Sequence, residues 1–154
     1  MLIPMAFRPL ALLVLILGLF AGSASAQQAP APSLAPISEQ DRAAIRSIIQ
    51  GQVDAFRRDD GAAAFDYASP SIHQLFGTPD VFMDMVRQGY PMVYRPRVFD
   101  FGDIVMLNGA PTQKVLVVGP DGKRHMAFYP MTRLPDGNWR IDGCYLQAPE
   151  EHQA

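Results

Sequence analysis

Asp142, His125 and Tyr129 are the residues whose types best fit acid–base chemistry in this sequence. A carboxylate or an imidazole in an apolar cavity can act as a general base, because burial shifts its pKa toward the working range. Asp142 is the strongest carboxylate candidate. His125 and Tyr129, expected on one face of the neighbouring strand, would be its hydrogen-bonding partners. The alternative is structural: Asp142 pairs with Arg140 or with a loop N–H and only holds its own strand.

Cys144, the only cysteine, follows Asp142 by two residues. An acidic neighbour raises the pKa of a thiol, and a reactive thiolate needs a nearby cation or base. The sequence therefore favours a buried structural cysteine over a nucleophile, while a disulfide to a second chain stays open. Strand alternation predicts one face with Arg140, Asp142, Cys144 and Leu146, and the opposite face with Trp139, Ile141, Gly143 and Tyr145.

A connection rich in tyrosine, proline and arginine spans residues 88–97 and contains Tyr90, Tyr94 and Arg95. As the rim of a pocket, it would hold an acidic or aromatic ligand. As a rigid turn, it would only cover the edge of the core. The full set of ligand-binding candidates is Phe65, Phe76, Tyr90, Tyr94, Arg95, His125, Tyr129 and Asp142.

Histidine spacing and net charge argue against metal ions and nucleic acids as ligands. His73, His125 and His152 are the only histidines, and no two of them have the spacing of a metal-ligand pair. The net charge is −2, without the basic excess typical of nucleic-acid binders. We therefore expect no metal, no cofactor and no nucleic acid partner. With 154 residues, of which 49% are hydrophobic, the chain can form one folded domain.

The first half of the domain has the apolar period of helices. Apolar residues recur every three or four positions between Ile45 and Phe56, and Ser38 and Thr78 are suitable helix N-caps. The predicted helices run from 38 to a polar stop at 59–61, over 62–67 with one further turn at 71–76, and from 78 to 89.

From Pro96 onward the pattern has the period of strands. Turn signals at 108–109, 119–122 and 135–138 leave four strands, near 97–107, 113–119, 123–133 and 139–146. Tight turns make neighbouring strands antiparallel. The predicted fold class is therefore α+β, with three N-terminal helices packed on a curved, cone-like, four-stranded antiparallel sheet.

The N-terminal segment has the features of a secretory leader. Arg8 precedes an apolar run from 10 to 20, and Ala24-Ser25-Ala26 is a small-residue cleavage signal. We expect cleavage after Ala26, no stable membrane anchor afterwards, and a periplasmic or secreted protein. The expected organisation is a signal peptide at 1–26, an Ala/Pro-rich linker at 27–37, one α+β domain at 38–147 and a polar tail at 148–154.

The order of elements resembles the nuclear transport factor 2-like superfamily, which includes the SnoaL-like proteins. The residues that carry this resemblance are 55–65, at the end of the first helix, and 136–141, at the start of the last strand. Segments 75–79, 85–91, 94–96 and 139–144 more closely resemble a bacterial domain-of-unknown-function family, number 4864. The resemblance implies the fold but no reaction, because members of the superfamily differ in activity. The catalytic acidic pairs of its enzymes match no positions here.

These observations predict a module that binds a small ligand or a protein partner in a cone-shaped cavity, and favour a non-enzymatic function. Two alternatives stay open. One is a cofactor-free lyase or isomerase with Asp142 as general base and Tyr129 or His125 as its hydrogen-bonding partner. The other is a structural subunit that forms homodimers, because the segment 115–118 (Val-Leu-Val-Val) offers apolar side chains to both faces of the sheet.

Overall fold

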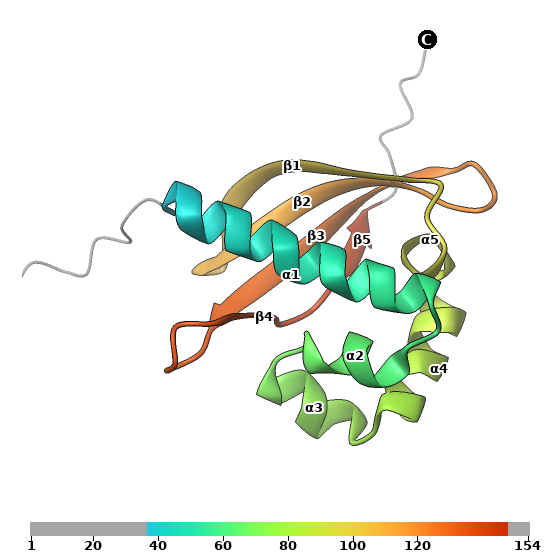
Figure 1. The fold of residues 1–154 in the computed structure, drawn as a ribbon. Coiled ribbons are helices and arrows are strands. Elements are labelled where there is room, and N and C mark those ends of the chain that lie inside the picture. Colours follow the sequence, from blue (N-terminus) through green and yellow to red (C-terminus); the bar gives the residue numbers. More distant parts are fainter. Residues whose placement is uncertain (1–36, 148–154) are drawn as a thin grey trace, which may run out of the picture. The chain divides into compact units, whose positions relative to one another are not determined.

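A computed structural model describes residues 37–147, which form helices on one face of an antiparallel sheet (Figure 1). The expected signal peptide, the linker up to residue 36 and the polar tail at 148–154 lie outside these residues. Within the described part, no helix is long and apolar enough to cross a membrane. The elements are α1 (Glu39–Arg57), α2 (Gly61–Asp66), α3 (Pro70–Phe76), α4 (Pro79–Gly89), α5 (Pro91–Tyr94), β1 (Val98–Leu107), β2 (Ala110–Val118), β3 (Arg124–Arg133), β4 (Trp139–Ile141) and β5 (Tyr145–Gln147).

The long helix α1 lies across the inner face of the sheet (Figure 1). Its start is fixed by Ser38, whose hydroxyl accepts a hydrogen bond from the backbone N–H of Asp41 at 3.0 Å. Its apolar stripe is fully buried and supplies one wall of the core. The buried residues of that stripe are Ile45, Ile49, Val53 and Phe56.

The prediction of three helices is wrong, because the described residues contain five. Two prolines explain the difference. Pro70 and Pro91 each occupy the first turn of a separate short helix, where the missing N–H costs nothing but where the preceding helix cannot continue. Ser69 caps α3 by accepting from the N–H of Ile72, and Gly77 ends α3 with a φ of +73°.

The sheet has the order β1-β2-β3-β4, with β5 also paired to β3, and all pairs named here are antiparallel. The expected single strand at 139–146 is in fact two strands. The backbone of Asp142 leaves the regular ladder, with its N–H donating to the carbonyl of Pro130, and Gly143 takes a φ of +158°. The chain therefore bends between β4, which pairs with one end of β3, and β5, which pairs nearer the other.

This bend corrects the predicted faces of the last strand. Trp139 and Ile141 are buried against the helices, whereas Arg140 between them lies on the other face of the strand. After the bend the alternation shifts, so that Cys144 also packs against the core while Tyr145 is exposed. Cys144 thus shares the inner face with Ile141, and does not share a face with Asp142. An irregularity of one residue is enough to invert the side chains that follow it.

Candidate functional site

A cavity of about 220 Å³ lies between the helices and the inner face of the sheet. Its walls come from both halves of the chain, from α1 to the bend between β4 and β5. The helical half provides most of the surface, and β3 and the bend close one side. The lining residues are Gln52, Phe56, Ala68, Ile72, Leu75, Phe76, Phe82, Met85, Val86, Tyr90, Val93, Tyr129, Ile141, Gly143 and Cys144.

Aromatic rings form the helical wall. Phe82 of α4 stands at its centre, with ring centroids 6.1 Å from Phe56, 5.6 Å from Phe76 and 5.3 Å from Phe65. These distances are within the range in which aromatic pairs attract each other. The wall therefore combines rings from α1, α2, α3 and α4, and three of the four line the cavity itself.

None of the lining residues carries a charged side chain. The polar groups are the amide of Gln52, the hydroxyls of Tyr90 and Tyr129 and the thiol of Cys144. Gln52 donates to the carbonyl of Ala64 at 3.1 Å, and the Tyr90 hydroxyl donates to the carbonyl of Cys144 at 2.9 Å. An uncharged, mostly apolar cavity favours an uncharged, mostly apolar occupant.

The Tyr129 hydroxyl is the exception among these groups. It is buried and has no hydrogen-bond partner within residues 37–147. Burial raises the pKa of Tyr129 well above its usual value, and the neighbouring Cys144 thiol raises it further. The thiol acts on that pKa partly as a weak hydrogen-bonding neighbour, and no strong acceptor among the described residues contacts the hydroxyl. At neutral pH the phenol is therefore protonated and can donate.

The Cys144 thiol is also protonated in the folded protein. Burial raises its pKa to about 12, and the Tyr129 hydroxyl opposes part of that shift. A thiol with this pKa is a poor nucleophile. The sequence also favoured an unreactive cysteine, but on the ground of an acidic neighbour. In the structure the thiol pKa is raised by desolvation, since Asp142 does not face the thiol.

Asp142 does not line the cavity. Its side chain is exposed, and one carboxylate oxygen accepts a hydrogen bond from the buried Ser69 hydroxyl at 2.5 Å. Ser69 is the N-cap of α3, so this contact ties the start of α3 to the bend after β4. The structural alternative for Asp142 thus matches its position, with Ser69 in the place of the partners predicted from the sequence.

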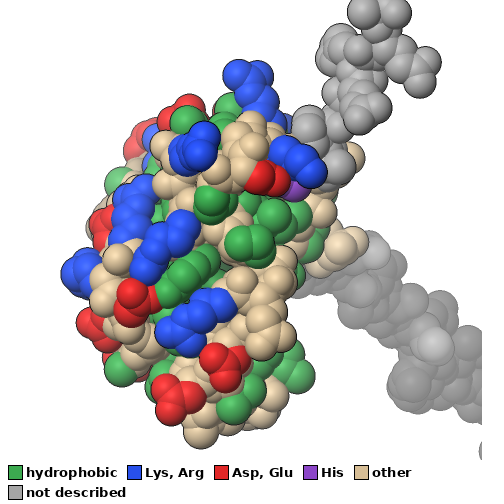
Figure 2. Space-filling model, turned by 90° about the vertical axis from the view of Figure 1, so that its right-hand side faces the viewer, with side chains coloured by type: hydrophobic (Ala, Val, Ile, Leu, Met, Phe, Trp, Pro, Cys, Tyr) green, Lys and Arg blue, Asp and Glu red, His purple; other side chains and the backbone are tan. Residues whose placement is uncertain are grey.

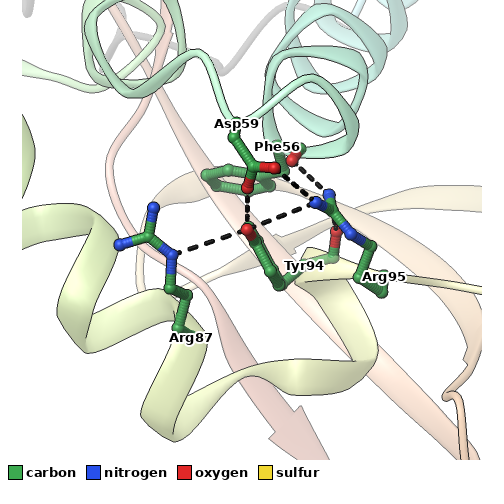
Figure 3. Close-up of polar contacts among 5 residues, drawn as sticks. All are labelled: Phe56, Asp59, Arg87, Tyr94 and Arg95. Carbon is green, nitrogen blue, oxygen red and sulfur yellow. Dashed lines mark hydrogen bonds and ion pairs between the residues drawn. The ribbon is translucent and has the colours of Figure 1, made fainter.

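Tyr94 and Arg95 also lie away from the cavity, in a polar cluster at the end of α1 (Figure 3). The Arg95 guanidinium donates to the backbone carbonyl of Phe56 and forms an ion pair with Asp59 at 2.8 Å. It also stacks 4.1 Å from the centroid of the Tyr94 ring, and the Tyr94 hydroxyl donates to Asp59. The cluster joins α5 to the last turn of α1.

His125 shares the inner face of β3 with Tyr129 but is four residues away, which is about 13 Å along a strand. One small ligand in this cavity cannot contact both side chains. The His125 Nε2 atom is buried without a partner among the described residues. In the same part of the chain, no three His, Cys, Asp or Glu side chains are grouped closely enough to hold a metal ion.

Of the eight ligand-binding candidates, Phe76, Tyr90 and Tyr129 line the cavity, whereas Phe65 packs behind it. Sequence reasoning missed Phe56, Phe82, Val86 and Val93. Phe56 belongs to the apolar stripe recognised from the sequence, and Phe82 and Val86 lie in the helix predicted from 78 to 89. An apolar helical pattern does not distinguish a residue in the packed core from one beside a cavity.

The outer surface shows no continuous basic region on the face drawn in Figure 2. Lys and Arg side chains there are interspersed with acidic and hydrophobic ones (Figure 2). Several arginines of the described residues are paired with aspartates, among them Arg57 with Asp54 and Arg87 with Asp84. This distribution does not suggest a surface for a polyanion.

Comparisons with known proteins give a family and no activity. A family model described as Domain of unknown function (DUF4864) matches residues 38–154. No curated protein and no solved structure matches the chain. The resemblance to family 4864 is thereby confirmed, and the arrangement of helices and sheet is compatible with the nuclear transport factor 2-like superfamily.

Proposed function

The chain belongs to the DUF4864 family, and from the geometry of its cavity we propose that it is a module that binds a small, predominantly apolar molecule. The observation that carries this proposal is the cavity of about 220 Å³, lined without a single charged side chain. Protein interiors are otherwise packed with few voids larger than a water molecule. A hollow of this size, lined at its edge by Leu75 with 72% of its surface exposed, leaves apolar surface in contact with water that a bound ligand would cover.

Acid–base catalysis receives less support from the same site. The lining contains no carboxylate and no imidazole, and the carboxylate of Asp142 lies outside it on Ser69. The two groups in the lining with raised pKa values, Tyr129 and Cys144, both stay protonated near neutral pH. A lyase or isomerase that uses Asp142 as its base would need this carboxylate to leave Ser69 and turn into the cavity.

We place the binding module in the periplasm or outside the cell. This part of the proposal rests on the N-terminal sequence alone, with Arg8, the apolar run at 10–20 and the small residues at 24–26. A protein in that compartment would meet its ligand after export.

Native mass spectrometry of the mature protein, purified from its own compartment, tests the binding function. We expect a mass above that of the chain, released on gentle activation. In the variant Ile72→Trp, the larger side chain narrows the cavity, and the extra mass should be lost. The matched control is Val81→Trp on α4, because Val81 is 53% exposed and does not line the cavity. Wild-type protein that never carries a ligand, even when offered small apolar compounds, would contradict the proposal.

A second candidate function is a homodimeric structural subunit. It is favoured by apolar side chains on the outer face of the sheet, where Leu116 pairs with Met126 and the rings of Phe128 and Tyr145 stack at 5.2 Å. Tyr145 is 44% exposed, and the other three are partly exposed. Its test is given in the Discussion.

A further inference from the structure

We propose that the cavity selects an uncharged ring compound that carries one hydrogen-bond-accepting oxygen, such as a carbonyl, and that the Tyr129 hydroxyl donates to this oxygen. This inference rests on the proposed binding function and adds the chemical class of the ligand. The site it concerns is the inner wall of the cavity, where Tyr129 and Cys144 meet.

The unpartnered hydroxyl of Tyr129 carries the inference. Its side chain is completely buried, and no described residue accepts its proton. A buried polar group without a partner destabilises the fold, so such groups are rare and call for an explanation. The other hydroxyl in the lining, that of Tyr90, is already bonded to the carbonyl of Cys144. Tyr129 therefore offers the one hydroxyl in the lining that has no hydrogen-bond partner among the described residues.

The protonation states of Tyr129 and Cys144 bear on which hydrogen-bonding group the ligand carries. The phenol of Tyr129 and the thiol of Cys144 both keep their protons at neutral pH, because burial raises the pKa of each. A protonated phenol can donate as well as accept, and we assign the Tyr129 hydroxyl the donor role, for which the matching group on the ligand is an acceptor. A carboxylate would also accept, but no lining cation is available to compensate the cost of burying its charge.

The size and composition of the cavity indicate a ring. An engineered apolar cavity of about 150 Å³ binds benzene, and this cavity, at about 220 Å³, has room for a larger molecule. Phe56, Phe76, Phe82 and Tyr90 supply aromatic surface against which a flat ring packs favourably. A bicyclic ketone is the simplest compound that meets these conditions.

Isothermal titration calorimetry with three bicyclic probes tests the inference. The probes are 1-tetralone, which has a carbonyl, tetralin, which lacks it, and 2-naphthoate, which is charged. We expect wild-type protein to bind 1-tetralone about tenfold more tightly than tetralin, as one hydrogen bond to a buried donor allows. It should bind 2-naphthoate more weakly than either. In Tyr129→Phe the preference for the ketone should disappear, while the affinity for tetralin stays within about twofold.

Tyr145→Phe is the matched control, because it removes a tyrosine hydroxyl from an exposed side chain that does not line the cavity. It should keep the preference for 1-tetralone, and thermal unfolding of each variant confirms that it is folded. Equal affinities for ketone and hydrocarbon, or a preference that survives in Tyr129→Phe, would overturn the role of Tyr129 and leave the binding function intact. Tight binding of 2-naphthoate would overturn the uncharged class. If none of the three probes binds wild-type protein, this inference fails, and native mass spectrometry of the purified protein shows whether the proposed binding function fails with it.

Discussion

Cys144 shows how the environment of one residue decides its chemistry. The thiol has a pKa of about 12 in the folded protein, against 9.0 in the absence of the fold, and the cause is burial. The protein therefore holds this residue in its neutral form over the whole physiological range. A role as nucleophile or as redox switch would require a thiolate that the fold disfavours.

The pH dependence of stability follows from this shift. Above pH 9 the unfolded chain loses the thiol proton while the folded protein keeps it, so the unfolded state binds fewer protons and stability falls as pH rises. This loss continues up to about pH 12, at up to about 1.4 kcal/mol per pH unit. Denaturant unfolding between pH 8 and 11 should therefore show a steeper decline for wild-type protein than for Cys144→Ala. The raised pKa of Tyr129 acts in the same direction in both proteins. Parallel profiles would mean that the thiol is not buried as described.

At the scale of elements, the end of α1 depends on the cluster around Arg95. The guanidinium donates to the carbonyl of Phe56, which also accepts from the N–H of Asp59, and it pairs with the Asp59 carboxylate and stacks on Tyr94. Asp59 itself has a φ of +57°, so the chain reverses direction where the cluster holds it. These contacts connect α1 to α5, two elements that both line the cavity.

Replacement of Arg95 by alanine should destabilise the protein by about 1–2 kcal/mol. The ion pair contributes little of this, because Arg95 and Asp59 are 38% and 52% exposed. Most of the loss comes from the carbonyl of Phe56 and from the stacking on Tyr94. Arg58→Ala is the control. Arg58 is an exposed arginine at the C-cap of α1, and it has no ion pair among the described residues. Urea denaturation measures both variants, and equal losses would contradict a specific role for Arg95.

The helix starts and the bend after β4 illustrate what the sequence can and cannot predict. Ser38, Thr78 and the Asn108-Gly109 turn act only on residues near them in the sequence. The starts of α1 and α4 and the first hairpin could therefore be predicted. The bend at Gly143 could not, because it depends on a hydrogen bond from Asp142 to Pro130 on another strand. The sequence predicted a buried Cys144, but not that Cys144 and Ile141 lie on the same inner face while Asp142 does not.

Whole-molecule behaviour depends on the outer face of the sheet. Leu116, Met126, Phe128 and Tyr145 lie on this face, away from the helices, and leave apolar surface exposed to solvent. Two copies that met through this face would bury it, and an interface of this kind is self-complementary about a twofold axis. None of these four residues lines the cavity, so a dimer formed this way would not bury the cavity lining in its interface.

Light scattering at micromolar concentration should give the mass of a dimer, and Leu116→Lys should give that of a monomer, because a charge would then be buried at the interface. Val81→Lys is the control, since Val81 is an exposed apolar residue on α4, outside the sheet. A wild-type protein that is monomeric throughout would contradict the dimer. A dimer that persists in Leu116→Lys would place the interface on another surface.

The bond between Ser69 and Asp142 joins two residues separated by most of the domain, and with the bridge between Ala68 and Ile141 it closes the wall of the cavity. Chain synthesis supplies these partners in order, with the helices first and Asp142 near the end. During synthesis, the start of α3 therefore lacks its bond to the sheet until nearly the whole domain has left the ribosome, although α3 can already pack on α2 and α4. The binding cavity thus cannot exist on a partly made chain, and a ligand that entered it early would find one wall missing.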